Sequence, residues 1–532
     1  MSLLTSRGVA VVREVPRAAA IFASPWTTLA LLCLALAQQI AGHLDCDVSW
    51  FITFAEKVAD GAVPYVDVTD PNPPAAFLAL VPAVALARAL GLAVEPVVAG
   101  LVFFAAGLSL GLCALIFRAG APRSREEWRL LLNAAVFLLL VAPAFVFAER
   151  EHVALLALAP MLASLAVCAE GGRVAVPLRV LAGLGAGIAV CFKPFFILAI
   201  ILPAAALALR ERSIRLLLTP EAIIAGGLCA LYGAATLVFF PAYAHYALPT
   251  ILEVYQPARE GWVKLALLSA APFNVALLLG LAVAAARGFA HPSAAPAFVA
   301  PAAARVCAFA SAGFLAGFFI QGKGWTNHAY PGLALALLAW CFFLLHAHPR
   351  ARAACDGGPF KFVFLPIFIC LPALFGAANL ISDGEEHPGL RAELARVAPA
   401  HPRLIAMARQ LDFGHPVTRQ LAGTWVGRPN ALWTASFAAH LIREAPDEAT
   451  RARLEAYRRR DLAGFAADVR AGAPDAIIVE DKGTREWVLK QAETAGVLEG
   501  FEKTGEAGEI ELWTRKARVA ASRPEASQRS FR

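Results

Sequence analysis

The acidic and basic side chains of this sequence gather in short polar segments between long apolar runs. The first such segment, residues 43–74, reads HLDCDVSWFITFAEKVADGAVPYVDVTDPNPP and carries Asp45 and Asp47 one residue apart. Lipid cannot satisfy the irregular backbone of a charged, proline-rich segment, so these residues must lie at a membrane surface. A carboxylate held there can accept the proton of a hydroxyl group. The alternative is a connecting loop that Trp50 and Tyr65 merely anchor at the interface.

Three later polar segments carry cations and aromatic rings. They read FAEREH at residues 147–152, FKP at 192–194 and QGKGWTNH at 321–328. Their cations could hold a phosphate group, and their aromatic faces could support a sugar ring. Each segment also has a structural interpretation: a turn whose charges pair with one another, a lysine that extends to the interface along its apolar stem, or an interfacial anchor.

The composition indicates that most of the chain lies in a membrane. Of the 532 residues, 59% are hydrophobic and 16% are charged, and the mean hydropathy is +0.62. Soluble domains carry about 25% charged residues. The net charge of +7 is modest, and we attribute it to loop arginines rather than to nucleic-acid binding. The ten cysteines form no CxxC or His/Cys cluster typical of a metal site, and none follows Asp383.

Apolar runs of membrane length predict a mainly α-helical, polytopic transmembrane bundle of about 11–13 spans. After an uncleaved first span over 26–42, they cover 75–92, 93–117, 129–148, 152–170, 174–192, 193–209, 221–241, 263–287, 305–320, 328–345 and 361–380. Arginines concentrate at 118–129, 173–179, 210–215, 287–305 and 350–361. The positive-inside rule therefore predicts that these loops and the N-terminus are cytoplasmic.

The same rule predicts that the richest polar segments face outward. They are 43–74, 148–152, 192–194, 242–262 and 321–328, together with everything after residue 381. This topology requires that only one of the runs 75–92 and 93–117 crosses the membrane. The first run contains Pro82 and Arg88, so we expect it to form a partial or re-entrant helix.

The sequence divides into a transmembrane module, 1–382, and a soluble α/β domain outside the membrane, 383–532. In the second part, Asp447 can cap a helix that extends through Arg470. Residues 476–479 predict a short buried strand, and residues 509–513 alternate as a second strand. Thr484 is expected to cap another helix, which Gly496 ends. No nucleotide-binding fingerprint accompanies these elements.

The polar segments resemble the motifs of the GT-C superfamily of polytopic glycosyltransferases. The nearest families are the protein O-mannosyltransferases and the lipid A aminoarabinose transferases, and the resemblance covers residues 25–345. The acidic pair of the first outer loop matches Asp45 and Asp47, although Cys46 separates them here. The run Gly-x-x-Pro/Leu-Tyr-x-Asp…Pro-Pro matches residues 61–67 and 72–74, an arginine turn matches 149–152, and a Gly-rich helix ending in Lys-Pro matches 183–194. His152 stands where many members have an acid.

We therefore expect an inverting glycosyltransferase of the inner membrane with an outward-facing site. It would move a sugar from a polyprenyl-phosphate donor to a hydroxyl of a lipid, polysaccharide or protein. Asp45 is the expected general base, with Asp47 second. The donor phosphate would be held by Arg150, Lys193, Arg259 and Lys323. The expected substrate-binding residues are Tyr65, Asp67, Glu151, His152, Trp325 and His328.

Several alternatives stay open at this point. A transporter or flippase of lipid-linked sugars would need polar residues deep in the membrane. The runs offer few, chiefly Asn133, Lys193 and Asn274. A non-catalytic component of polysaccharide export is a further alternative. No cofactor is certain, but Asp45 and Asp47 could hold a divalent metal ion. The expected partners are the lipid-linked donor, the acceptor and membrane lipids, with no nucleic acid.

Overall fold

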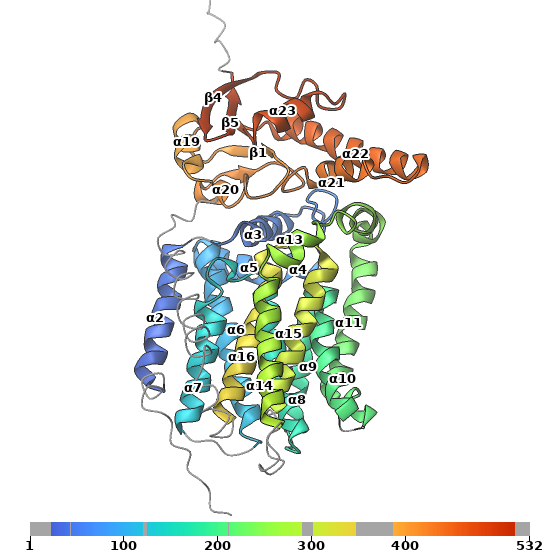
Figure 1. Ribbon diagram of the computed structural model, residues 1–532. Coiled ribbons are helices and arrows are strands. Elements are labelled where there is room, and N and C mark those ends of the chain that lie inside the picture. The colour runs from blue at the N-terminus through green and yellow to red at the C-terminus, as the bar shows by residue number, and fades with distance from the viewer. Residues whose placement is uncertain are drawn as a thin grey trace, which may run out of the picture. The chain divides into compact units, whose positions relative to one another are not determined.

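The computed structural model describes residues 23–42, 44–120, 125–210, 212–289, 302–346 and 387–516. The chain separates into two compact units, Met1–Gly384 and Glu385–Arg532. The first unit is a helical bundle, and the second combines helices with a small sheet (Figure 1).

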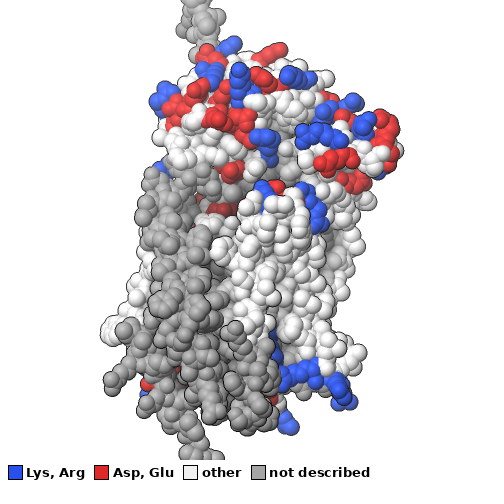
Figure 2. All heavy atoms as spheres, viewed as in Figure 1, with Lys and Arg blue, Asp and Glu red and all other residues white. Residues whose placement is uncertain are grey.

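Long helices packed side by side make up the first unit. They are α2 (Pro25–Ala41), α6 (Val94–Phe117), α7 (Arg125–Val136), α8 (Arg150–Ala169), α9 (Val176–Phe192), α10 (Leu198–Arg210), α11 (Pro220–Phe239), α14 (Ala271–Phe289), α15 (Ala302–Gln321) and α16 (Thr326–His346). The centre of the core is α8, which packs against α6, α9, α15 and α16. On the face that Figure 2 shows, the described helices present a band with few charges, and lysines and arginines gather at its lower end.

Among the described residues, five helices are long and apolar enough to cross a membrane: α6, α8, α11, α15 and α16. The bent pair α2 and α3 (Cys46–Ala59) makes a sixth candidate. Shorter apolar helices cover Ala75–Leu90, Val176–Phe192, Pro194–Arg210 and Ala271–Ala285. The chain is thus a multi-pass membrane protein. The total of 11–13 spans stays a prediction, because 361–380 and most of the arginine-rich loops at 287–305 and 350–361 lie outside the described residues.

The run 75–92 does not form a full crossing. It folds into α4 (Ala75–Leu78) and α5 (Val81–Leu90), and Gly91 in the left-handed conformation ends α5. Together the two helices cover Ala75–Leu90, which at about 1.5 Å per residue rises roughly 24 Å, less than the hydrocarbon thickness of about 30 Å. Arg88 instead pairs with Asp60, at the end of α3, at 2.8 Å. This agrees with the expectation that only one of the two neighbouring runs crosses.

Two predicted spans are broken. The run 129–148 continues from α7 into a π-helical turn, η1 (Phe137–Val141), and a 3₁₀ turn, η2 (Ala144–Val146), because Pro143 cannot extend a regular helix. The run 263–287 divides into α13 (Trp262–Leu267) and α14. Conversely, much of the expected loop 242–262 is helical, with the short elements η5 (Tyr243–Ala247), α12 (Leu248–Thr250) and η6 (Ile251–Tyr255). Two further short turns flank α10: η3 (Pro194–Ile197) and η4 (Ile214–Leu216).

The helices α8, α9 and α11 are in very close contact. A Cβ added to Gly185 of α9 would meet the carbonyl oxygen of Ala157 in α8 at 2.3 Å, so only glycine fits there. Arg179 of α9 donates from Nε and Nη2 to the two oxygens of Glu221 in α11, both at 2.7 Å. Ser164 of α8 also donates to Glu221, which is 1% exposed. A buried ion pair therefore ties the three helices together.

The second unit is a five-stranded mixed sheet with helices. Its strands follow the order β2-β1-β3-β5-β4, in which β1 pairs in parallel with β2 and β3 while β5 is antiparallel to β3 and β4. They are β1 (Arg403–Met407), β2 (Thr424–Trp425), β3 (Ala476–Val479), β4 (Phe501–Ala507) and β5 (Ile510–Arg515), and the helices are α19 (Leu390–Val397), α20 (Val417–Gln420), α21 (Trp433–Ile442), α22 (Glu448–Gly472) and α23 (Lys482–Leu489).

Three of the four elements expected in this unit are confirmed. Asp447 caps α22, β3 covers 476–479 and is fully buried, and β5 contains most of 509–513. The expectation for Thr484 was wrong. Asp481 caps α23 by accepting a hydrogen bond from the Thr484 N–H at 2.6 Å, and α23 ends at Leu489 rather than at Gly496. An aspartate three residues earlier supplies the same cap.

Candidate active site

Asp45 is fixed by its own helix. It is the N-cap residue of α3, and its Oδ1 accepts hydrogen bonds from the backbone N–H of Asp47 at 2.8 Å and from the Cys46 thiol at 3.6 Å. A carboxylate is favoured here because it satisfies a free N–H group and faces the positive end of the helix dipole. The sequence Asp-Cys-Asp therefore orients Asp45 locally.

Glu149 brings a third carboxylate to this pair. It is the N-cap residue of α8, is 2% exposed, and has a carboxylate oxygen within 4.8 Å of oxygens of both Asp45 and Asp47. Burial and the neighbouring negative charges raise the pKa of Asp45 and of Glu149. The two carboxyl groups lie close enough to share a hydrogen bond, and therefore a proton. Sequence reasoning gave Glu149 no role, and its position beside Arg150 in the outer turn was the only signal.

Arg150 faces the same cluster. Its Nη2 donates to Oδ2 of Asp47 at 2.7 Å, and its guanidinium lies 4.6 Å from the ring centroid of Phe51. Arg150 is 6% exposed, and its Nε and Nη1 find no hydrogen-bond partner among the described residues. Buried donors without a partner are costly unless a ligand satisfies them, and a guanidinium fork matches a phosphate.

A second buried charge cluster adjoins the first, because Glu151 follows Arg150 on α8. Lys193, between α9 and η3, donates to Oε1 of Glu151, and its Nζ lies 2.8 Å from Nε2 of His328 at the start of α16. The ammonium is the donor, so the imidazole proton is on Nδ1. This Nδ1 is buried without a hydrogen-bond partner among the described residues.

Both ring nitrogens of His152 form hydrogen bonds with the backbone. Its Nδ1 accepts a hydrogen bond from the Ala148 N–H at 3.1 Å, so its proton is on Nε2, which donates to the Leu139 carbonyl at 2.7 Å. Both ring nitrogens are thereby used, and the side chain is fully buried. His152 holds the turn that presents Glu149 against the π-helical turn η1.

The loop between α15 and α16 carries Lys323. Its Nζ donates to the carbonyls of Tyr255, at 2.6 Å, and of Ala258, and lies 4.1 Å from the Tyr255 ring centroid. Burial lowers the pKa of Lys323 to about 8. Nearby, Arg259 donates to the Phe319 carbonyl at 2.5 Å and passes directly over Gly322. Gly322 has φ +65°, and a Cβ there would lie 2.7 Å from the Arg259 Nε, so the loop requires glycine.

The rest of the polar segment that follows α3 is held by its own hydrogen bonds. Tyr65 is buried and donates to the Asn72 carbonyl at 2.7 Å. Asp67 is exposed, and its Oδ2 accepts from the Val63 N–H at 2.8 Å within a turn. Asp70, outside the expected site, is 5% exposed and accepts from the indole N–H of Trp50 at 2.8 Å. Burial raises the pKa of Asp70.

An apolar cavity of about 190 Å³ opens beside the carboxylates. Glu149 and Arg150 line one part of it, and the remainder is apolar side chains of α3, α4, α5, α6, α8 and the end of α9. Trp325 lies apart from this cavity, is 40% exposed, and has its ring centroid 5.1 Å from that of His328. Asp45, Asp47, Glu149 and Arg150 therefore form one centre, Glu151, Lys193 and His328 form the next, and Asp67 belongs to neither.

This bundle, with the polar segment of Asp45 and Asp47 between α2 and α6 and a second unit that contains a sheet, has the fold of the GT-C membrane glycosyltransferases. The particular neighbour is ArnT, the lipid A aminoarabinose transferase, from Cupriavidus metallidurans. Its structure bound to undecaprenyl phosphate is similar with a TM-score of 0.56 and 13% identity over 94% of this chain and 99% of that chain. The apo structure gives 0.56 and 14% over 92% and 97%.

The predicted resemblance is confirmed for the fold, and at this identity the likeness concerns the fold alone. Neither a protein-family model nor a curated protein sequence matches the chain.

Proposed function

We propose that this protein transfers a sugar from a polyprenyl-phosphate donor to a hydroxyl acceptor, with inversion at the anomeric carbon. The observation that carries the proposal is Arg150: two of its guanidinium nitrogens are buried and unpartnered among the described residues, beside paired carboxyl groups and at an apolar cavity. A polyprenyl-phosphate sugar would use all three features: the guanidinium for its phosphate, a carboxylate as the base, and the apolar cavity for its lipid chain. The bound lipid in the ArnT structure, undecaprenyl phosphate, supports the same class of donor.

The reaction needs a base and a stabilised leaving group. The acceptor hydroxyl gives its proton to a carboxylate while its oxygen attacks the anomeric carbon. The bond between that carbon and the phosphate oxygen breaks, and the polyprenyl phosphate leaves with the electron pair. Arg150 would neutralise the charge that develops on the phosphate.

We assign the base to Asp45, acting with Glu149. Asp47 has one oxygen engaged by Arg150, so its role is to hold the guanidinium in place. The raised pKa of Asp45 and Glu149 makes their carboxylates stronger bases than ordinary surface carboxylates.

Other residues of the expected site would act around this centre. His328 offers its buried Nδ1–H to a sugar hydroxyl, and Trp325 offers a partly exposed ring face. Lys193 and Lys323 would add positive charge near the donor, and Arg259 would fix the loop that carries Lys323. Glu151, His152 and Tyr65 would hold these groups in place, whereas Asp67 lies in an exposed turn apart from them.

The arginine distribution supports an inner-membrane location with this site facing outward. The unit 383–532 would then be periplasmic or extracellular, and the N-terminus cytoplasmic. Reporter fusions at Arg125 and after Arg532 should report opposite compartments. Fusions reporting one common compartment would overturn the orientation.

A transporter is less well supported. Its transport path would need accessible polar groups within the bundle. In the described part, the Ser311 hydroxyl lies 2.9 Å from Oδ1 of Asn274 and 2.7 Å from the Gly332 carbonyl oxygen, and Thr28 donates to Asn133 at 2.5 Å. These polar groups bond to one another across neighbouring helices, which is how helices are joined in lipid.

The deciding experiment is a transfer assay on membranes that contain the protein and an undecaprenyl-phosphate sugar. Lipid and polysaccharide profiling of a deletion strain would first name the missing sugar. Release of undecaprenyl phosphate matched by sugar on an acceptor supports the proposal. Movement of intact donor across the membrane, without release of the lipid phosphate, would establish the transporter instead.

A further inference from the structure

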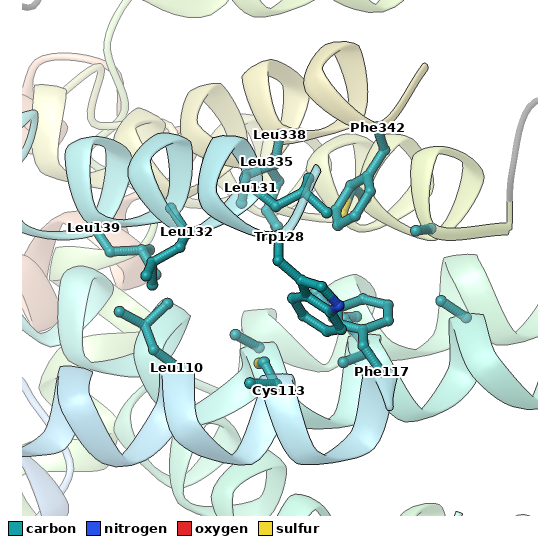
Figure 3. A pocket seen from close by; sticks show the side chains of 18 of the residues that line it. Leu110, Cys113, Phe117, Trp128, Leu131, Leu132, Leu139, Leu335, Leu338 and Phe342 are labelled. Carbon is teal, nitrogen blue, oxygen red and sulfur yellow. The ribbon is translucent and has the colours of Figure 1, made fainter. Parts of the chain in front are cut away.

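A larger cavity lies at the other end of the bundle, away from Asp45 and Glu149. Its volume is about 330 Å³, and it is enclosed by α6, α7, α8, α15 and α16 (Figure 3). It uses the C-terminal part of α6, the second halves of α8 and α16, most of α7 and the first two turns of α15. The active-site residues lie at the first turn of α8 and around the junction of α15 with α16, so the two cavities belong to opposite ends of the same helices.

The walls of this cavity are hydrocarbon-like. Leu110, Leu132 and Leu139 line one part, and Leu335 and Phe342 of α16 line another (Figure 3). A cavity of about 150 Å³ with such walls stays dry and takes up apolar molecules. In a membrane, the apolar molecule at hand is a lipid chain.

Two arginines give the cavity a charged rim. Arg118 follows the last residue of α6, Arg129 lies in the second turn of α7, and both line the cavity and are exposed. Neither forms an ion pair or side-chain hydrogen bond with any residue that the structure describes. Trp128, beside Arg129, also lines the cavity. Tryptophan and arginine at the end of an apolar helix are typical of the level of the lipid head groups.

Basic pockets between membrane helices bind anionic head groups, because guanidinium groups form paired hydrogen bonds with phosphate. We propose that this cavity binds an anionic phospholipid of the leaflet opposite the active site. One acyl chain would fill the leucine-lined space, and Arg118 and Arg129 would hold the phosphate. The site is separate from the donor site, so the proposal stands whether or not the chain is a glycosyltransferase.

The test is native mass spectrometry of the full-length protein in a mild non-ionic detergent. Phosphatidylglycerol and phosphatidylcholine with identical acyl chains are added in turn, and retained lipid is counted. We expect phosphatidylglycerol to be retained better than phosphatidylcholine. The double variant Arg118→Gln/Arg129→Gln should lower its retention about tenfold, because each cation near the head group contributes separately.

The matched control is Arg212→Gln/Arg215→Gln. These arginines are also exposed, follow α10 in another arginine-rich loop, and do not line the cavity. The control should retain phosphatidylglycerol as the parent does. Equal losses in both double variants would mean a general charge effect and would overturn the site, as would equal retention of the two lipids or parental retention in Arg118→Gln/Arg129→Gln.

A second variant tests the apolar part. Ala135→Phe places a ring into the space that α7 lines and should displace the lipid, with the unfolding temperature measured alongside. If it fails to fold, the exposed arginine pair alone decides the result. The proposal would also be overturned if the parent protein forms a dimer, Ala135→Phe abolishes that dimer, and no lipid is specifically retained. That result would assign the cavity to contact with a second copy of the protein.

Discussion

Arg150 donates a hydrogen bond of 2.7 Å to Asp47, 103 residues earlier in the chain. This ion pair connects the first turn of α8 to the first turn of α3. It uses one oxygen of Asp47 and one nitrogen of Arg150. The remaining nitrogens of Arg150 and the neighbouring Asp45–Glu149 pair are thereby directed to the same small volume.

Asp45→Asn should lower sugar transfer by at least about a hundredfold, because a positioned base contributes about 10²–10⁴-fold. Asparagine also caps helices, so α3 should still form. Glu149→Gln should cause a loss of similar size. Asp67→Asn is the control, since Asp67 is exposed and belongs to a turn. Transfer rates at matched protein levels check this, and a rate for Asp45→Asn within a few-fold of the parent would remove Asp45 as the base.

Arg150→Lys should weaken donor binding roughly tenfold or more, because hydrogen bonds to a charged group contribute about 1.5–3 kcal/mol and lysine lacks the planar fork. Asp47→Asn should weaken it less, since the guanidinium remains but is less firmly held. Binding of a radiolabelled polyprenyl-phosphate sugar to membranes measures both. Unchanged affinity in Arg150→Lys would show that the two free nitrogens do not meet the phosphate.

Glu151→Gln and Lys193→Met should each destabilise the bundle by about 3–5 kcal/mol, because each leaves one buried charge without its partner. The double variant should recover most of this loss. Thermal unfolding of the detergent-solubilised protein gives the comparison. If the stability loss of the double variant equals the sum of the two single losses, the two side chains do not stabilise each other.

Donor affinity should fall as the pH rises through about 8, since Lys323 has a folded-state pKa of about 8 and loses its charge there. Below that pH the lysine is charged and attracts the phosphate. Lys323→Met should bind donor more weakly at pH 7 and should lose this part of the pH dependence. Donor binding measured from pH 6.5 to 9.5 is the check, and an identical slope in parent and variant would place the titrating group elsewhere.

Chelation should leave transfer within about twofold of the untreated rate. The oxygens of Asp45, Asp47 and Glu149 lie close enough to hold a divalent ion. However, Arg150 engages Asp47, and Asp45 and Glu149 are close enough to share a proton instead. Loss of activity in EDTA that Mg²⁺ or Mn²⁺ restores would show that the three carboxylates are ligands.

Local chemistry explains what the sequence could predict of this site. Asp45, Asp47, Arg150, Lys193 and Lys323 were proposed as site residues because they lie in short polar segments between apolar runs, and the cost of charge in lipid makes such segments informative. The cap at Asp447 and the strand at 476–479 likewise follow from neighbouring residues alone.

Pairing across the chain could not be predicted in this way. Nothing near Lys193 indicates that Glu151 and His328, 42 and 135 residues away, neutralise and orient it. His152 was expected to bind substrate, yet its two nitrogens bind the backbone of Ala148 and of Leu139. Leu139 belongs to the π-helical turn η1, which the periodicity of the sequence does not predict. The sequence does not distinguish Glu149 from its charged neighbours. Only the folded structure brings it close to Asp45 and Asp47.

The close packing of α8, α9 and α11 has a consequence for motion. Glu149 and Arg150 stand on α8, whose backbone touches that of α9 at Gly185 and whose other end is tied to Glu221. Helices in such contact cannot slide without opening voids. We therefore expect an opening that admits a long lipid to involve the segment 243–262, where two π-helical turns leave room for a change of register. The packing of α8 would then hold Glu149 and Arg150 in place, while we expect the segment that carries Tyr255 and Arg259 to move.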